Sequence, residues 1–180
     1  MIENCSDILF AEDSSCSFES FNCGVRSINN FIRKGLLEKV ALGHCIARVC
    51  VERETQELIG VVTVSPYCLD RKRWGVRDNL DLIPQDVVSK FRERYPVPGW
   101  LIGQLAISRA YQGRGYGEYL LMDALDMIRQ RAANGCGSIV VVHTENDRVK
   151  PFYLKYGFRQ LPPDDSSVVF LPVRELSMLG

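Results

Sequence analysis

A glycine-rich stretch past the middle of the chain carries residue types that bind anions. It reads Gln112-Gly113-Arg114-Gly115-Tyr116-Gly117. The apolar run before it, residues 100–107, is typical of a buried strand, and an amphipathic helix is expected to begin at about Gly115. The first N–H groups of a helix lack intrahelical partners, and glycines let the backbone approach a phosphate closely. The stretch therefore predicts a phosphate site where a strand passes into a helix.

The same glycines have other interpretations. A plain glycine-rich turn remains open while the stretch is considered alone. A dinucleotide-binding fold needs the glycines early in a βαβ unit, with an acidic residue about 20 positions on. Here they lie past mid-chain, and Asp123 and Asp126 fall inside the following helix. A Walker loop needs Gly-Lys-Ser/Thr, which this stretch does not contain.

A second informative segment spans residues 138–158. Residues 138–143 form a β-branched run that is typical of a buried strand. Asn146 or Asp147 is expected to cap a short helix that carries Phe152 and Tyr153, and Gly157 to end it. The segment thus predicts a second strand and helix behind the glycine stretch.

Together the two segments resemble the GCN5-related N-acetyltransferases, the GNAT family. In that family Gln/Arg-x-x-Gly-x-Gly/Ala follows the fourth strand, and a later Asn is followed by Tyr seven residues on and by Gly-Phe. This chain supplies Gln112, Gly115 and Gly117 for the first pattern and Asn146, Tyr153, Gly157 and Phe158 for the second. The resemblance implies an α/β (α+β) fold with a mixed central sheet of six to seven strands. It also implies helices on both faces and a V-shaped splay between the fourth and fifth strands.

The resemblance further implies acetyl-coenzyme A as cosubstrate. The backbone of Gly113, Arg114, Gly115, Tyr116 and Gly117, together with Gln112, would hold its pyrophosphate. The backbone of Leu105, Ala106 and Ile107 would pair with the pantetheine arm like an added strand, and the Asn146 amide would fix that arm. Tyr153 would be the general acid that protonates the leaving thiolate, because a phenol with a pKa of about 10 is protonated at neutral pH. A core tyrosine packed beside Phe152 is the alternative.

Composition limits the remaining possibilities. The 180 residues are 46% hydrophobic with a formal net charge of zero, which suits one domain over residues 1–180. The seven cysteines form no C-x-x-C pair and no signal peptide is recognisable, so we expect reduced thiols and a cytoplasmic protein. With His44 and His143 as the only histidines, no metal site is expected, and no apolar run is long enough for a membrane span.

The N-terminal third of the chain resembles one particular group within the GNAT family. Residues 18–44 show helical spacing, as one helix or as two with a break at Gly35. The string Phe21-Asn22-Cys23-Gly24, with Ile28, Asn29 and Phe31 after it, is similar to the opening of GNAT toxins of bacterial type II toxin–antitoxin modules. Those enzymes acetylate the α-amine of aminoacyl-tRNA. The resemblance implies aminoacyl-tRNA as acceptor, a ribbon-helix-helix antitoxin as partner, and a homodimer.

Two basic sets could contact RNA phosphates. They lie at residues 71–77, around Trp74, and at Lys90, Arg92 and Arg94. A solvated face is the alternative, since acidic residues dilute both sets. The toxin-like pattern also departs at Gly103-Gln104-Leu105-Ala106-Ile107-Ser108, where the toxins commonly have Arg in place of Gln104.

The expected central strand, residues 101–107, contains no carboxylate that could act as a base. Water or a backbone carbonyl would then accept the amine proton. At pH 7.4 a lysine amine is neutral in only about one molecule in a thousand, whereas an α-amine is neutral in roughly a third of molecules. The sequence therefore favours an α-amino acceptor. A small-molecule amine or a protein N-terminus stays an alternative, as does a non-catalytic acyl-coenzyme A-binding module.

Overall fold

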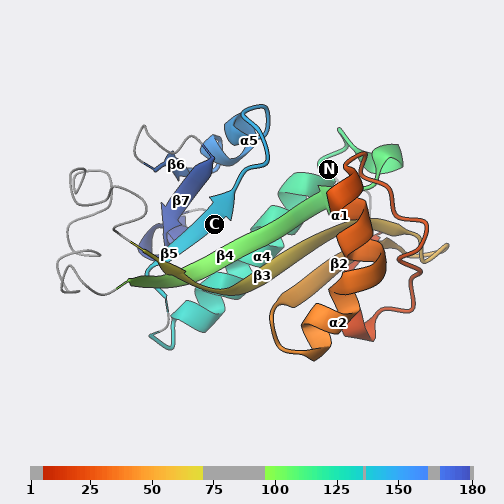
Figure 1. Cartoon of the computed structure of the whole chain (residues 1–180), viewed down its shortest axis with the longest axis horizontal. Helices are drawn as coiled ribbons and strands as arrows, with labels where there is room; N and C mark the ends of the chain where they lie inside the picture. The colour runs from red at the N-terminus through yellow and green to blue at the C-terminus, as the bar shows by residue number, and fades with distance from the viewer. Residues whose placement is uncertain (1–5, 71–95, 136, 162–166, 179–180) are drawn as a thin grey trace. The chain divides into compact units, whose positions relative to one another are not determined.

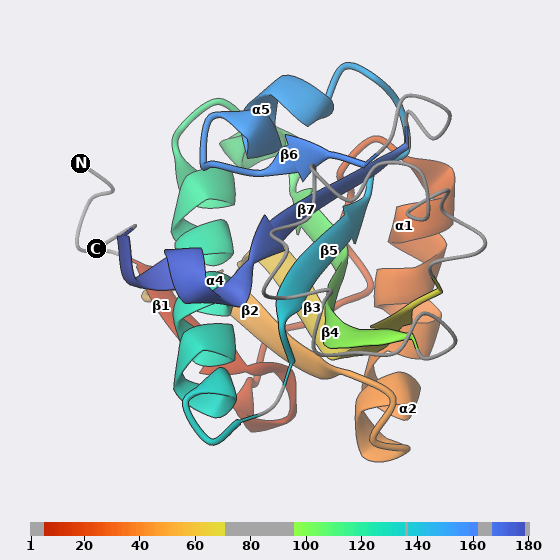
Figure 2. The ribbon, with the colours of Figure 1, turned by 90° about the vertical axis from the view of Figure 1, so that its left-hand side faces the viewer.

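The computed structural model describes residues 6–70, 96–135, 137–161 and 167–178. Within them, seven strands form one sheet in the order β1-β2-β3-β4-β5-β7-β6 (Figures 1 and 2). The strands are β1 (Ser6–Phe10), β2 (Ile46–Glu52), β3 (Leu58–Leu69), β4 (Val97–Ile107), β5 (Ile139–His143), β6 (Arg159–Gln160) and β7 (Val168–Pro172). The pairing of β4 with β5 is parallel, whereas β1–β2, β2–β3, β5–β7 and β6–β7 are antiparallel. The predicted mixed sheet is confirmed.

The helical elements precede, connect and follow these strands. They are η1 (Ala11–Asp13), α1 (Arg26–Asn30), η2 (Phe31–Gly35), α2 (Leu36–Ala41), η3 (Arg109–Tyr111), α4 (Tyr116–Ala132), α5 (Lys150–Leu154) and η4 (Val173–Met178). In the described parts of the chain, no helix is long and apolar enough to cross a membrane. The five cysteines among the described residues are free thiols.

The chain divides into two compact units. The first contains Met1–Ser65 and Gly103–Leu125, and the second contains Pro66–Ile102 and Asp126–Gly180. Three elements, β3, β4 and α4, run through both units. Both basic sets predicted from the sequence, at residues 71–77 and 90–94, lie outside the described residues.

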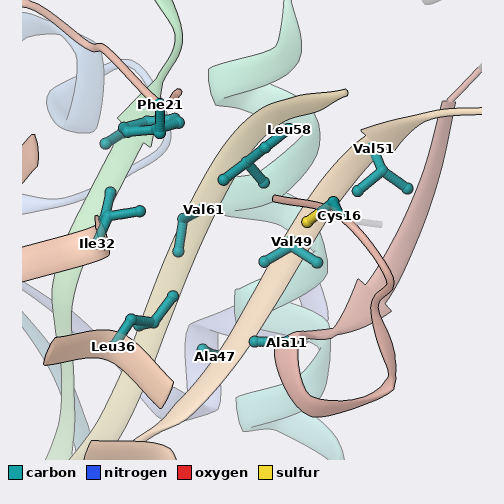
Figure 3. Close-up of a cluster of buried hydrophobic side chains, with 11 residues drawn as sticks. Ala11, Cys16, Phe21, Ile32, Leu36, Ala47, Val49, Val51, Leu58 and Val61 are labelled. Atoms are coloured by element: carbon teal, nitrogen blue, oxygen red, sulfur yellow. The ribbon is translucent and has the colours of Figure 1, made fainter. Parts of the chain in front are cut away.

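In the first unit, alternating side chains of β2 face two different helical layers. Ala47, Val49 and Val51 are fully buried in a cluster with Ile32 and Leu36 of the N-terminal helical segment (Figure 3). Arg48 faces the other way, and its guanidinium pairs with the Asp123 carboxylate of α4 at 2.9 Å. A period of two in the strand therefore places helices on both faces of the sheet, as predicted.

The N-terminal helical segment changes type at Gly35. The α-helix α1 continues into the π-helical segment η2, and α2 begins directly after Gly35. The predicted break therefore falls at the predicted residue, although the chain stays helical across it. Because Ile32 and Leu36 lie four residues apart, both point to the sheet and are at most 1% exposed (Figure 3).

The second unit is built on β5, a run of four buried residues between two strands. It pairs with β4 from Gly99↔Ile139 to Ile102↔Val142 and with β7 on its other side. Ile139, Val141, Phe170 and Leu161 are at most 1% exposed in the core cluster of this unit. Figure 2 shows β5, β7 and β6 side by side beneath α5. The predicted splay between β4 and β5 stays a prediction.

Candidate active site

The glycine stretch forms an exposed loop between η3 and α4, close to its predicted place. Gly113 has φ +76° and Gly115 has φ +89°. These are left-handed values that L-residues rarely adopt, so the sequence needs glycine at both positions. Helix α4 begins at Tyr116, one residue later than predicted, and runs for 17 residues. Its first N–H groups and its dipole therefore meet the loop at Gly115 and Tyr116.

Gln112 holds this loop through its side chain. Its amide nitrogen donates to the Ile107 carbonyl and to the Cys23 carbonyl, each at 2.9 Å. The first bond closes the turn after β4, and the second joins that turn to the segment before α1. Since the two N–H groups of the amide serve backbone carbonyls, the side chain positions the loop and offers only its oxygen to other groups.

Tyr116 and Arg114 differ in their surroundings. Tyr116 is 8% exposed and packs edge-on against Tyr111, with ring centroids 5.9 Å apart. The Tyr111 hydroxyl donates to the Glu57 carboxylate at 2.8 Å, and desolvation together with that carboxylate raises the pKa of Tyr111 to about 12. The exposed Arg114 guanidinium lies 5.6 Å from the centre of the Tyr111 ring. The Tyr116 ring is therefore part of the packing beneath the loop, whereas the Arg114 guanidinium lies at its exposed surface.

The backbone of Leu105, Ala106 and Ile107 lies at the end of β4. On the β3 side, the N–H of Gln104 donates to the Thr63 hydroxyl at 2.9 Å, and the N–H of Ser108 donates to the Ile59 carbonyl at 2.8 Å. Ala106 is 5% exposed and belongs to the core cluster of the first unit. This stretch starts three residues beyond Ile102, where the pairing with β5 ends.

Asn146 belongs to the second unit and does not cap α5. The N-cap position is Val149, which makes no side-chain capping bond. Pro151 lies in the first turn, where its fixed φ suits a helix start, and this places the helix after Asn146. The Asn146 side-chain oxygen instead accepts the N–H of Arg148 at 3.0 Å. The predicted cap was wrong; the residue forms a turn that leads to the helix.

Tyr153 lies on α5 and is 7% exposed. Its ring packs edge-on against Phe152, with centroids 5.1 Å apart, and against Phe158 at 5.5 Å. Desolvation by burial raises the pKa of Tyr153 to about 12. The phenol is therefore neutral and carries its proton across the whole physiological pH range. Both the packing role and the proton-donor role considered from the sequence fit this environment.

The sequence interpretation did not single out a tyrosine–histidine pair in the second unit. The Tyr67 hydroxyl lies 3.2 Å from His143 Nε2, and the two rings meet edge-on with centroids 5.8 Å apart. The two residues are 76 positions apart, at the ends of different strands, so no local pattern links them. In the described residues, no group of three or more metal-ligating side chains gathers.

Comparison with protein families identifies the chain. The model of the GNAT acetyltransferase family matches residues 25–158. The chain belongs to this family. It is therefore an acyltransferase, and the loop at Gly113 and Gly115 lies within the matched region.

Known proteins resemble the chain in sequence and in fold. A tRNA-acetylating toxin of Mycobacterium tuberculosis is 33% identical over 85 residues, which are 47% of this chain and 51% of that protein. The chain therefore matches about half the length of this relative. A mutant of KacT superposes with a TM-score of 0.83 at 24% identity over 98% of this chain and 99% of that one. AtaT complexed with acetyl-methionyl-tRNAfMet gives 0.81 at 20% identity, covering 97% and 98%. AtaTR bound with AcCoA gives 0.77 at 20% identity, covering 97% and 98%.

Proposed function

We propose that the chain is an acetyl-coenzyme A-dependent N-acetyltransferase that acts on the α-amine of aminoacyl-tRNA. The observation that carries the acetyl-coenzyme A part is the loop with positive φ at Gly113 and Gly115 that leads into a 17-residue helix. Such a loop brings the first N–H groups of the helix, which have no partner within the helix, and the positive end of the helix dipole to one place. A pyrophosphate is the part of coenzyme A that needs them.

The remaining cofactor contacts in this proposal are those that the resemblance to the GNAT family implies. The backbone from Gly113 to Gly117 holds the pyrophosphate, and Arg114 adds a charge-assisted contact. The backbone of Leu105, Ala106 and Ile107 pairs with the pantetheine arm. Asn146 fixes that arm through its side-chain amide. Gln112 supports the site by positioning the loop, in agreement with its two bonds to backbone carbonyls.

Tyr153 is the general acid in this proposal. Acetyl-coenzyme A supplies an activated thioester carbonyl. The acceptor nitrogen bonds to the carbonyl carbon, the carbon–sulfur bond breaks, and the thiolate takes the phenol proton of Tyr153. Its buried phenol, with a pKa of about 12, is protonated for this step. The proton of the new ammonium passes to water or to a backbone carbonyl, and Tyr153 regains a proton from solvent.

Two lines support aminoacyl-tRNA as the acceptor. The relative from Mycobacterium tuberculosis is a tRNA-acetylating toxin, and AtaT is known in complex with acetyl-methionyl-tRNAfMet. The absence of a carboxylate from β4 suits an amine that is already partly neutral, as an α-amine is near pH 7.

The proposal also includes the biological role of the protein. It acts as a toxin in the cytoplasm, and a ribbon-helix-helix antitoxin binds it. AtaT has a structure with the C-terminus of its antitoxin AtaR. We also expect a homodimer.

The test is acetyl transfer from labelled acetyl-coenzyme A to bulk charged tRNA, with Tyr153→Phe measured in parallel. Label in the aminoacyl fraction that disappears in the variant supports both the acceptor and the acid. Bound coenzyme A with no labelled tRNA overturns the acceptor and favours a small amine or a protein N-terminus. Bound coenzyme A with no transfer to any amine favours a non-catalytic binding module.

A further inference from the structure

A buried asparagine organises the segment before α1. Asn29 is 9% exposed, although its neighbours on the helical segment, Ile28 and Ile32, pack on the apolar core. Its side-chain oxygen accepts the Cys23 N–H at 2.9 Å and the Cys23 thiol at 3.2 Å. Its side-chain nitrogen donates to the Asn22 side-chain oxygen at 2.9 Å. Both ends of the amide are therefore engaged, and each bond fixes the segment from Asn22 to Gly24.

That segment in turn contacts the turn that carries the glycine loop. The N–H of Arg109 donates to the Asn22 carbonyl, and the Gln112 amide donates to the Cys23 carbonyl, both at 2.9 Å. Gly24, at φ +95°, lies against the Arg109 side chain, where an added Cβ would stand 2.8 Å from Nε. A continuous set of hydrogen bonds therefore runs from Asn29 through Asn22 and Cys23 to Arg109 and Gln112.

We propose that Asn29 is a positioning residue for the pyrophosphate loop. The inference rests on the proposed acetyl-coenzyme A site. Asn29 acts through the two carbonyls of Asn22 and Cys23, which fix Arg109 and Gln112 on the N-terminal side of Gly113. An apolar residue would suit the packing of α1 better, whereas an amide supplies both an acceptor for Cys23 and a donor for Asn22. The toxin-like segment at residues 21–31 thereby supports the binding of acetyl-coenzyme A.

The test compares coenzyme A with pantetheine, which lacks the pyrophosphate. In Asn29→Ala the affinity for coenzyme A falls about tenfold, because buried hydrogen bonds are lost and the loop loses its fixed start. The KM for acetyl-coenzyme A rises by a similar factor, while kcat and the affinity for pantetheine stay within about twofold. Asn29→Asp, which keeps the acceptor and loses the donor, gives a smaller loss. The matched control is Asn30→Ala, because Asn30 is the exposed neighbour on α1.

A second variant keeps the test decisive if Asn29→Ala fails to fold. Gln112→Met breaks the same set of bonds at its exposed end, and it should also weaken coenzyme A binding while sparing pantetheine. In the folded double variant, Asn29→Asp with Gln112→Met, the loss of coenzyme A binding free energy is smaller than the sum of the losses in the two single variants. Equal losses for both ligands, or additive losses, overturn the inference. If the unmodified protein binds no coenzyme A, the proposed function itself fails, which is a separate outcome.

Discussion

Tyr153 is the residue on which the proposed chemistry depends most directly. Replacing it with Phe removes one hydroxyl and keeps the ring between Phe152 and Phe158, so the packing is preserved. General acids typically contribute about 10²–10⁴ in rate, and we expect kcat to fall within that range. Coenzyme A affinity measured by calorimetry should stay unchanged. Tyr156→Phe is the matched control, because Tyr156 is 9% exposed and also packs on Phe152. An equal loss in both variants would show a packing effect.

The pH profile follows from the burial of the same phenol. Because the pKa of Tyr153 is raised to about 12, the proton-donating form persists above its ordinary limit near pH 10 and is lost only as the pH rises through about 12. With an α-amine acceptor, the rate should rise to about pH 8, as the amine loses its proton, and then stay level up to about pH 10.5. Measuring kcat from pH 6 to 10.5 checks this. A fall with a midpoint near pH 9 would point to a different acid.

Residue types in the site were predictable, but most contacts between them were not. The glycines at 113 and 115 were recognisable because only glycine takes a positive φ at little cost, and both have it. The bond from Gln112 to Cys23 joins positions 89 residues apart, and Tyr67 meets His143 across 76 residues. Such pairs depend on the order of strands in the sheet. Helix α5, which carries Tyr153, likewise contacts β7. The burial that raises the pKa of its phenol is therefore not visible in the local sequence.

The loop between β4 and α4 can be tested by a pair of glycine substitutions. Gly113 and Gly135 have φ values of +76° and +88°, and neither has a heavy atom within 4 Å of an added Cβ. Alanine at either position should therefore cost a similar strain, about 1–2 kcal/mol of unfolding free energy. Only Gly113→Ala distorts the proposed pyrophosphate site, so it alone should weaken coenzyme A binding, by about tenfold. Chemical denaturation and calorimetry give the two quantities, and equal binding by both variants would exclude Gly113 from the site.

Element types were predicted better than their ends. Dense apolar residues are typical of strands over β2 and the first part of β3. Strand β3 then continues through Pro66 to Leu69, because Leu69 lies in a second core cluster. Helix α5 begins at Lys150 because Pro151 suits the first turn, so Asn146 became a turn residue. Local patterns therefore show which elements form. Prolines and long-range packing decide where the elements begin and end.

At the scale of the whole molecule, charge limits how the protein can bind RNA. The chain has 22 basic and 22 acidic residues, so no overall positive field attracts a polyanion. The binding of tRNA that the proposed function requires must then come from a local set of cations that contact phosphates. The set at residues 71–77 combines Arg71, Lys72, Arg73 and Arg77 with Trp74, whose ring can stack on a base.

We therefore expect tRNA affinity to fall linearly with salt on logarithmic axes, with a slope set by this cluster. Each phosphate contact contributes about 0.7 to 0.9 to the magnitude of the slope. Replacing both Arg71 and Arg73 with Gln should therefore lower the magnitude of the slope by about 1.5. Arg129→Gln is the control, because its guanidinium is engaged with Asp126 on α4. The slopes are measured by fluorescence anisotropy of labelled tRNA at salt concentrations from about 50 to about 300 mM, over which phosphate contacts weaken. An unchanged slope in the double variant would mean that these arginines are a solvated face. The acceptor would then have to bind through other cations or not be RNA at all.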